Sequence, residues 1–473
     1  MRSFIVIAFT VLLTGCMVGP DYVRPVVDVP AAFRYEDRDA KETANTEWWR
    51  QFQDPVLDAL INEALANNKN VKVAVANIER AAGVLVQARS PLYPQIGYGG
   101  SAARERASES GAVPVPSIIP NPQNSYQVLA SASWEIDLWG RIRRLSESAQ
   151  AELFATEEAW HGVILSLVAS VASDYIQLLG LDAQLRVSKQ TLETYAESVK
   201  IFELRYKYGQ VSLMTVEQAR SQFETAAAAI PQIESQIAQT ENALCILLGR
   251  NPGPIQRGKT IHQLTLPAVP AGLPSDVLAN RPDIRQAEQN LIAANAQIGA
   301  AKALYYPTIS LTGAFGYASS DLSNLFQGSA RVWSYAGSFT GPIFTGGAIT
   351  SQVKQAEAAR NAALFSYELT IQSAFADAET SLVSRSKLVD QVQAQQRLVR
   401  ANREYVRLSR LQYDGGYAPY STVLQAEQQL FPSELNYAQS RAALFNSLVN
   451  IYKAMGGGWQ VVSEGIPDLP SKW

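Results

Sequence analysis

The chain has 473 residues, of which 47% are hydrophobic, so it is long enough to bury a large core. Its 40 Lys and Arg residues are offset by 43 Asp and Glu residues, and the formal net charge of −3 provides no basic surface for nucleic acid. Only two His and two Cys residues are present. This composition excludes the usual zinc sites and disulfide frameworks, and we expect no metal site, no cofactor and no catalytic residue.

The first 15 residues have the features of an export signal. Arg2 supplies a positive start, and an apolar stretch runs from Phe4 to Leu13, which is about half of the ~20 residues that a spanning helix needs. Leu13-Thr14-Gly15-Cys16 resembles the lipobox of bacterial lipoproteins, which implies that Cys16 becomes the first mature residue and carries acyl chains. Two or more acyl chains give stable attachment. Because Met17 rather than Asp follows the Cys, we expect the outer membrane as the destination.

No uninterrupted apolar run of 18 residues follows residue 16, so we expect any membrane-spanning part to be a β-barrel. The clearest strand covers residues 126–138, where even positions are apolar or small and odd positions are polar except Leu129. At about 3.3 Å per residue and a tilt of about 45°, such a strand rises by about 30 Å, close to the apolar band of outer-membrane barrels. Residues 309–317 and 333–343 repeat the alternation, and residues 95–106 show it less cleanly.

These four strands admit two interpretations. One is a periplasmic β-sandwich. The other is a membrane barrel, which four strands cannot close because the smallest barrels have about eight, so several chains would have to share it. On the barrel interpretation, Glu135 and Asp137 share the polar parity and are expected to line the lumen.

The chain also contains an internal two-fold repeat. At an offset of about 207 positions, Ile136, Gly140 and Ile142 recur as Ile343, Gly347 and Ile349. Upstream of the strands the offset is about 213, which locates an insertion of about six residues in the first hairpin loop, in the Pro-rich stretch 112–122.

Each repeat predicts long helices. Residues 141–208 would form one helix of about 100 Å at 1.5 Å per residue. Its apolar seam has 3-4 spacing, typical of a coiled coil, and contains Leu178, Leu181, Leu185, Leu192, Tyr195, Val199, Phe202 and Tyr206. In the second repeat the seam of Leu388, Val392, Val399, Val406 and Tyr413 is interrupted by Gln395, Asn402 and Ser409. Shorter helices are predicted over 54–90 and 213–248. Gly209, Gly415 and Gly416 are expected at the helix-hairpin tips.

Several motifs together resemble the TolC family of outer-membrane factors, in its lipoprotein branch typified by OprM and NodT. The resemblance runs from the lipobox to about Trp459. It is carried by Gly19-Pro20-Asp21-Tyr22, Arg24-Pro25, Trp48-Trp49, Phe52, Asp54-Pro55, the segment from Trp134 to Arg141, Leu273-Pro274-Ser275-Asp276, Arg281-Pro282-Asp283, Pro342-Ile343-Phe344 and the segment from Tyr452 to Trp459.

The resemblance implies an α+β membrane protein. Three identical chains would form a homotrimer with a 12-stranded outer-membrane β-barrel, four strands per chain, continued by a long periplasmic α-helical barrel. The implied organisation is a signal peptide (1–15), a lipidated N-terminal segment (16–53), a first repeat (54–249, hairpin about 94–140, tip near 209), an equatorial linker (250–274), a second repeat (275–455, hairpin about 307–345, tip near 415) and a C-terminal equatorial segment (456–473).

The function that the resemblance implies is a passive exit duct of a tripartite efflux system. Drugs or other small toxic compounds would arrive from a periplasmic adaptor protein and an inner-membrane resistance-nodulation-division pump, and the only lipid partners would be the outer membrane and the acyl chains on Cys16. Two alternatives remain: the outer-membrane duct of a type I secretion system, and a periplasmic coiled-coil scaffold lipoprotein.

A candidate periplasmic gate follows from the same resemblance. The family pattern places an acidic residue between a Leu four positions earlier and an Arg three positions later. Here Gln425 replaces the acid, Ser421 the Leu and Gln428 the Arg. An amide ring cannot attract or repel ions through net charge, so we expect closure to rest on hydrogen bonds and packing. The alternative is that Gln425 is an ordinary solvated helix residue.

Isolated polar residues offer little further chemistry. His161 and His262 are expected to be packing or surface residues, and Cys245 a small buried one. Arg141, Arg143 and Arg144 begin a helix directly below the strands. They could anchor at the membrane interface, but a solvated face is favoured.

Overall fold

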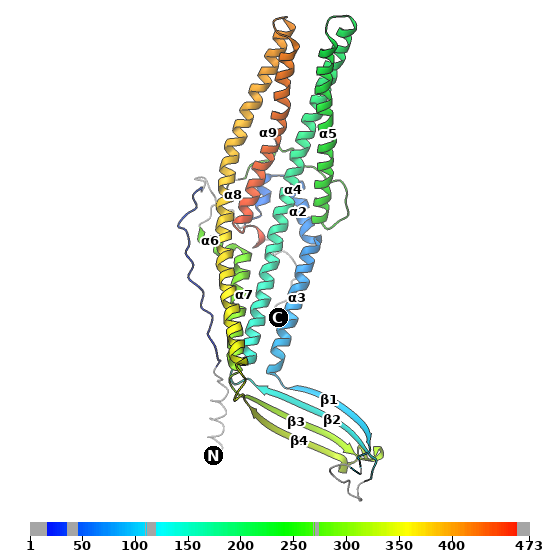
Figure 1. Ribbon diagram of the computed structural model, residues 1–473, viewed down its shortest axis with the longest axis vertical. Helices are drawn as coiled ribbons and strands as arrows, with labels where there is room; N and C mark the ends of the chain where they lie inside the picture. Colours follow the sequence, from blue (N-terminus) through cyan, green and yellow to red (C-terminus); the bar gives the residue numbers. More distant parts are fainter. Residues whose placement is uncertain are drawn as a thin grey trace. The chain divides into compact units, whose positions relative to one another are not determined.

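The computed structural model describes residues 17–35, 46–108, 110, 120–267, 269 and 274–460 (Figure 1). These residues fall into two compact units. One contains residues up to Val26, Ile78–Ala155 and Ala287–Tyr367, and it holds the sheet. The other contains Val27–Asn77, Thr156–Gln286 and the residues from Glu368 onward, and it holds the helix-hairpin tips.

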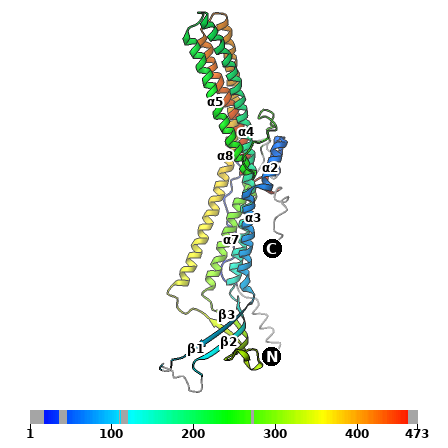
Figure 2. The ribbon, with the colours of Figure 1, turned by 90° about the vertical axis from the view of Figure 1, so that its right-hand side faces the viewer.

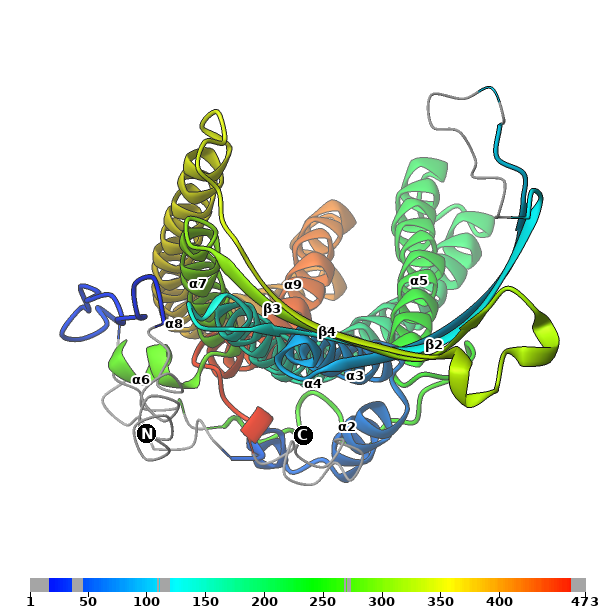
Figure 3. The same cartoon turned by 90° about the horizontal axis from the view of Figure 1, so that it is seen from below.

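The sheet of the first unit has four antiparallel strands in the order β1-β2-β3-β4 (Figure 1). The strands are β1 (Gln95–Glu105), β2 (Gln123–Ile136), β3 (Thr308–Ser319) and β4 (Arg331–Thr340). The central pair, β2 with β3, joins the hairpins of the two repeats, and the sheet is visibly bowed when seen from below (Figure 3). Leu138 and Ile343, which were expected within strands, lie outside them. Pro342 has no N–H to continue a ladder, and Leu138 instead donates to Ile136 O at 2.9 Å in a turn.

The register divides the sheet into one apolar and one polar face. Directly paired residues share a face, so Tyr98, Ala130, Phe315 and Trp333 form one row across the strands. The next row on the opposite face consists of Gly97, Ser131, Ala314 and Ser334. The aromatic face is uncovered: Tyr98 is 95% exposed and Tyr335 is 81% exposed. An uncovered aromatic face opposite small hydroxylated residues is the pattern of a membrane-facing strand with a wet interior.

The two repeats contain helices of equal length. Helices α4 (Arg141–Lys207) and α8 (Ala348–Asp414) have 67 residues each, while α5 (Leu213–Leu247) and α9 (Tyr420–Ala454) have 35 each. Corresponding bounds all differ by 207 positions, which is the offset read from the sequence. Figures 1 and 2 show α4 beside α5 and α8 beside α9 as antiparallel pairs.

Shorter elements complete the chain. These are the helices α2 (Pro55–Asn67), α3 (Lys69–Arg89), α6 (Pro274–Asn280) and α7 (Pro282–Ala303), and the 3-10 helices η1 (Trp48–Phe52), η2 (Ser90–Leu92), η3 (Leu322–Asn324) and η4 (Gly328–Ala330).

The single helix predicted over 54–90 is wrong, because the chain breaks at Asn68. Its backbone turns to ψ 132°, and its Oδ1 accepts hydrogen bonds from the amides of Asn70 and Val71 at 2.8 and 3.2 Å. This is the N-cap of a new helix. The Asn68 Nδ2 also donates to Leu247 O at 2.7 Å, so the break is fixed by a residue 179 positions away.

No uninterrupted apolar run of 18 residues follows residue 16, but one helix is apolar enough on average to be considered. Helix α4 contains an 18-residue window with at most two charged side chains, which by length and composition would suffice to cross a membrane. More than half of that window is buried among the described residues, as in the core helix of a folded protein. Tyr175 and Ile176 in this part of α4 are fully buried.

The predicted seams coincide with the buried helix faces for most of their length. Tyr195 and Phe202 of α4 lie in two buried clusters with residues of α5 and α9, whereas Tyr206 is 47% exposed. The polar interruptions of the second seam stay inside it. Asn402 is 7% exposed because its Nδ2 donates to Gln429 O at 3.1 Å, and Ser409 is buried too. At Asn402 a satisfied hydrogen bond allows a polar residue in the seam, whereas Gln395 Oε1 is buried without a hydrogen-bond partner.

Asp54 ties the start of the first repeat to the segment after α5. Its fully buried carboxylate accepts hydrogen bonds from Val56 N, Lys259 N and the Tyr175 hydroxyl at 3.0, 3.0 and 2.9 Å. An Asp54→Ala substitution leaves three donors without an acceptor and should cost about 3–5 kcal/mol of unfolding free energy, at about 1–3 kcal/mol for each donor. Thermal unfolding followed by circular dichroism measures the loss. Tyr175→Phe removes one of these donors and leaves the Gly258 amide without its acceptor, so it should cost about 1–2 kcal/mol; equal costs for both variants would contradict the network.

Candidate functional site

The long helix of each repeat ends in a glycine turn. Gly209 and Gly416 have φ of +70° and +74°, a left-handed conformation that glycine adopts without strain. The Gly209 and Gly416 amides donate to Tyr206 O and Tyr413 O at 2.9 and 3.0 Å, which closes the last turn of each helix. Gly415 lies in the same turn without a positive φ.

Side chains of all four long helices hold the tips together. A buried cluster joins α4, α5 and α9 and consists of Phe202, Val216, Ala219, Tyr420, Val423 and Leu424. Helix α8 joins through Tyr413, whose hydroxyl accepts a hydrogen bond from Arg205 Nη1 of α4 at 2.7 Å. The Arg205 guanidinium lies 5.7 Å from the Tyr413 ring centre, a cation–π distance. Side-chain packing and this hydrogen bond therefore hold the four helices together at the tips.

The three candidate gate residues lie on one face of α9. Ser421, Gln425 and Gln428 are all exposed, and their spacing of four and three residues places them in one line along the helix. Val423 and Leu424, between them in sequence, point into the buried cluster. These three side chains carry two amides and one hydroxyl, and none of them is a carboxylate.

Glu427 is a polar residue that the sequence pattern did not assign to the core. It is 3% exposed, and its Oε1 accepts a hydrogen bond from Arg410 Nη2 of α8 at 2.6 Å. The hydroxyl of Tyr195 of α4 donates to the Glu427 carbonyl at 3.4 Å. Glu427 lies four residues after Val423 and four before Phe431, and this spacing in the sequence could have predicted that it lies on the buried face of the helix. Glu427 thus connects α4, α8 and α9 instead of facing solvent.

The surroundings of Glu427 favour uncharged tyrosines. Burial, and secondly the Glu427 carboxylate, raises the pKa of both Tyr195 and Tyr420 above the ordinary tyrosine value. Both hydroxyls therefore remain protonated at neutral pH. A cavity of about 250 Å³ lies beside Tyr195, which lines it together with Arg410, Glu427 and other residues.

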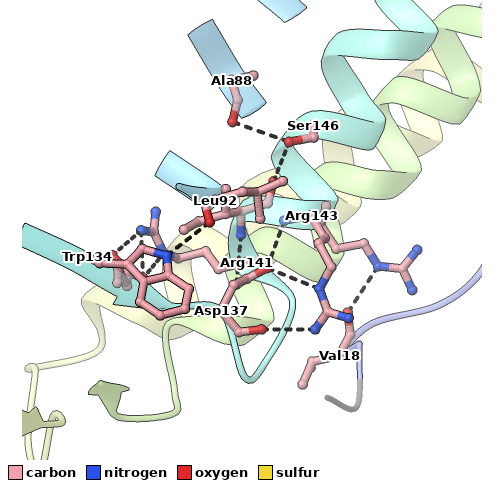
Figure 4. Close-up of polar contacts among 11 residues, drawn as sticks. Val18, Ala88, Leu92, Trp134, Asp137, Arg141, Arg143 and Ser146 are labelled. Atoms are coloured by element: carbon pink, nitrogen blue, oxygen red, sulfur yellow. Dashed lines mark hydrogen bonds and ion pairs between the residues drawn. The ribbon is translucent and has the colours of Figure 1, made fainter. Parts of the chain in front are cut away.

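A second polar group lies in the sheet-bearing unit, where β2 passes into α4 (Figure 4). The Asp137 carboxylate accepts hydrogen bonds from the amides of Ile142 and Arg143 at 3.0 and 2.9 Å, so it caps the helix N-terminus. Glu135 forms an ion pair with Arg141 at 2.8 Å. That these two carboxylates line the lumen stays a prediction. In the structure both pair with arginines, and Asp137 lies beyond the strand.

The expectation of a solvated arginine face fails. Arg141 and Arg143 pair with Glu135 and Asp137, and Arg144 is only 2% exposed along its side chain. Trp134 Nε1 donates to Leu92 O of η2 at 2.9 Å and Ser146 Oγ to Ala88 O of α3 at 3.2 Å, which ties both elements to the same junction (Figure 4). Ion pairs and hydrogen bonds therefore hold the passage from β2 into α4 together.

The remaining predicted residues have packing surroundings or lie outside the described residues. The centre of the His161 ring lies 4.1 Å from that of the Trp459 ring, with the two planes tilted by 33°, and His161 Nδ1 lies 3.1 Å from Glu158 Oε2. Burial and the nearby Arg441 lower the pKa of His262. Cys245 is fully buried. Cys16 lies outside the described residues. Among the residues that the structure describes, no group of three His, Cys, Asp or Glu side chains has metal-binding geometry.

Comparisons with known proteins agree with this architecture. The profile of the Outer membrane efflux protein family matches residues 60–250 and 273–457. The solvent efflux pump outer membrane protein SrpC of Pseudomonas putida is 36% identical over 458 residues, covering 95% of this chain and 97% of the relative. The cation efflux system protein CusC of Escherichia coli O6:H1 is 35% identical over 459 residues, covering 95% and 97%.

Solved outer-membrane channels share the fold. The outer-membrane channel OprN superimposes with a TM-score of 0.85 at 28% identity, covering 94% of this chain and all of that one. The open-state MtrE channel of Neisseria gonorrhoeae gives 0.84 at 31% identity, covering 94% and 99%. The resemblance to the TolC family, the fold and the outer-membrane location predicted from the sequence are thereby confirmed. The chain belongs to the outer membrane efflux protein family and is an outer-membrane channel that serves as an exit duct in efflux.

Proposed function

We propose that three copies of the chain close one barrel and one helical tunnel. The observation that carries this proposal is the open sheet: among the described residues, β1 and β4 each pair on one side only. Unpaired backbone groups cannot face lipid, so these edges require partners. Pairing β1 of one copy with β4 of the next gives twelve strands from three chains, above the minimum of about eight.

The helices of the same unit support the same closure. Hydrogen bonds and ion pairs order them as α3-α4-α7-α8: Ser146 to Ala88, Gln297 to Ser148 and Lys302 to Glu357. The outer helices α3 and α8 expose large apolar residues, with Val86 60% and Phe365 65% exposed. Packing α3 of one copy on α8 of the next would bury these side chains. The same rotational symmetry between copies pairs β4 with β1.

The proposed duct is passive and part of a tripartite assembly. An inner-membrane resistance-nodulation-division pump would supply the driving force, and a periplasmic adaptor protein would bias the tips toward their open state. The names of the relatives include toluene, solvent and cation efflux, so the proposed cargo is small toxic compounds of this range. No chemical step on the cargo is proposed.

A conductance measurement tests the duct. The detergent-purified chain should have the mass of a trimer and give discrete ion-conducting steps in planar bilayers. The same material unfolded by heat is the control and should be silent. A monomer that leaves the bilayer silent before heating would overturn the proposal. Deletion of the gene should also increase susceptibility to at least one dye, antibiotic, solvent or metal ion.

We further propose that Cys16 carries the acyl chains of a lipoprotein. The lipobox motif supports this assignment, since Cys16 follows Leu13-Thr14-Gly15. Mass spectrometry of the mature N-terminal peptide should show Cys16 as the first residue with at least two acyl chains. A peptide that starts elsewhere, or an unmodified Cys16, would contradict the assignment.

A further inference from the structure

A cavity of about 620 Å³ lies where α4 runs between α5 and α9 (Figure 1). Side-chain amides make up most of its polar lining. They come from all three helices and include Gln177 and Gln184 of α4, Gln232 and Gln236 of α5, and Asn436 and Gln439 of α9. The volume is within the range of about 300–1,000 Å³ that small-molecule sites occupy. The channel function described above gives this cavity no role.

Asp174 of α4 supplies the charge of the cavity. Among the described residues that line it, no other side chain is charged. The Asp174 carboxylate is half-buried, and no donor or cation in the described part of the chain pairs with it. Burial raises the pKa of Asp174, and no positive neighbour offsets this effect. A cation bound in the cavity would supply the missing partner.

The cavity lies on the side of the helices away from residues 250–264, the segment that follows α5. That segment is fixed to one residue of each helix: Arg257 pairs with Asp182 of α4 at 3.0 Å, Ile255 N donates to Glu241 of α5 at 3.1 Å, and Arg441 Nε of α9 donates to Ile261 O at 3.1 Å. The cavity amides Gln184, Gln239 and Gln439 each lie two positions from one of these three helix residues. Two positions rotate a helical side chain by about 200°, so the amides point to the opposite side.

This opposite side is the inside of the proposed tunnel. A segment that crossed the interior would obstruct the passage, so residues 250–264 belong on the outer wall. Gln439 lies 14 residues, or about four turns, after Gln425 on α9, so the cavity also shares the side of the candidate gate. Three copies related by rotation would place three such cavities around the passage.

We propose that this cavity is a binding site for organic cations that pass through the tunnel. The proposal rests on the proposed duct and names a class of its cargo, drug-sized molecules with a protonated or quaternary nitrogen. Asp174 would pair with the positive nitrogen, and the amides would form hydrogen bonds with other polar groups of the cargo. Leu181 and Ile233 of the lining would contact its apolar rings. A single carboxylate in each cavity binds weakly enough to let the cargo leave again.

Ethidium binding to the full-length, purified channel tests the site. Ethidium is a planar organic cation, and its fluorescence anisotropy in a non-ionic detergent measures the Kd. Asp174→Asn should raise this Kd about tenfold, because the cation loses a charged partner while the size of the side chain is kept. Asp390→Asn is the matched control. It removes the same charge from α8, where the Asp390 side chain is 71% exposed, and should change the Kd by less than about twofold.

An uncharged drug shows whether the charge is what the site recognises. Chloramphenicol, followed by equilibrium dialysis, should bind equally to the native channel and to Asp174→Asn. A gain of binding protects the test against misfolding: Gln236 is exposed on α5, so Gln236→Glu adds a second carboxylate to the cavity and should lower the Kd for ethidium at least threefold.

The site is overturned if the native channel does not bind ethidium, if Asp174→Asn and Asp390→Asn have equal effects, or if Asp174→Asn weakens chloramphenicol binding as much as ethidium binding. Conductance in planar bilayers separates this failure from failure of the duct. A channel that conducts but binds ethidium without regard to position 174 retains the duct and loses the site. A silent chain whose ethidium binding depends on Asp174 retains the cation site and loses the duct.

Discussion

Replacing Gln425 by Asp should convert the channel into a cation-selective one. If the passage narrows at the tips, as the candidate gate predicts, the three carboxylates that three copies place on the exposed face of α9 provide an effective fixed charge. We expect the cation-to-anion permeability ratio to rise about fivefold. The reversal potential across a salt gradient in planar bilayers measures it. Because an Asp carboxylate has an ordinary pKa of about 3.9, the gain should disappear below about pH 4.

The control for this prediction is Gln439→Asp. Gln439 is also exposed on α9 and lies 14 residues, or about 21 Å, from Gln425 along the same line. It adds the same charge away from the tips and should change the permeability ratio by less than about twofold. Equal effects of both substitutions would show that Gln425 does not lie at a constriction.

The native acid nearest to this face cannot take the place of a carboxylate ring. Glu427 follows Gln425 by two residues, which turns its side chain to the other side of α9. There it is 3% exposed and paired with Arg410. A paired, buried carboxylate adds almost no net charge to the passage. Gln425 and Gln428 therefore leave the candidate gate uncharged, and its closure is expected to depend on hydrogen bonds and packing.

The architecture was predictable because it rests on long periodic signals. Alternation over 13 residues, a 3-4 seam over 29 residues and a repeat with offsets of about 207 and 213 positions each average over many side chains. The bounds of α4 and α8 differ by 207 positions, as do those of α5 and α9, while those of α3 and α7 differ by 213 and 214. Signals of this length survive a few exceptions, such as Asn402 and Ser409 in the second seam.

What could not be predicted are single polar residues whose partners are distant in sequence. Arg144 looked like part of a solvated face because Asp21, its partner, lies 123 positions earlier. Asp54 and Tyr175 are 121 positions apart, and the break at Asn68 is fixed by Leu247. The local pattern of polar and apolar residues predicts the helix or strand to which a residue belongs. Whether a charged side chain is buried depends on the residues that pack against it, which can be distant in sequence. For a related reason, strand parity did not reveal that Glu135 and Asp137 pair with Arg141 and Arg143 at the start of α4.

Replacing Gly316 by Ala should abolish folding of the barrel. Gly316 lies on β3 opposite Leu129 of β2, in the pair that joins the two repeats. A Cβ at this position would collide with the carbonyl oxygen of Val128 and lie 2.9 Å from Leu129 Cα, so relief requires the two strands to separate. Overpacking costs about 1–3 kcal/mol in each chain, and a shared barrel contains three such sites. We expect at least a tenfold loss of folded trimer, measured by the mobility shift between unheated and heated samples in detergent gels, with loss of conductance.

The same row of the sheet supplies the control. Gly99 on β1 pairs with Leu129 from the other side, yet a Cβ there meets no atom within 4 Å. Gly99→Ala therefore adds the same methyl group to the same face and should leave the folded fraction unchanged. If Gly316→Ala folds as well as Gly99→Ala does, the β2–β3 register would have to be wrong. The proposed barrel would fail with it, because this pair is the only strand contact between the two repeats among the described residues of one chain.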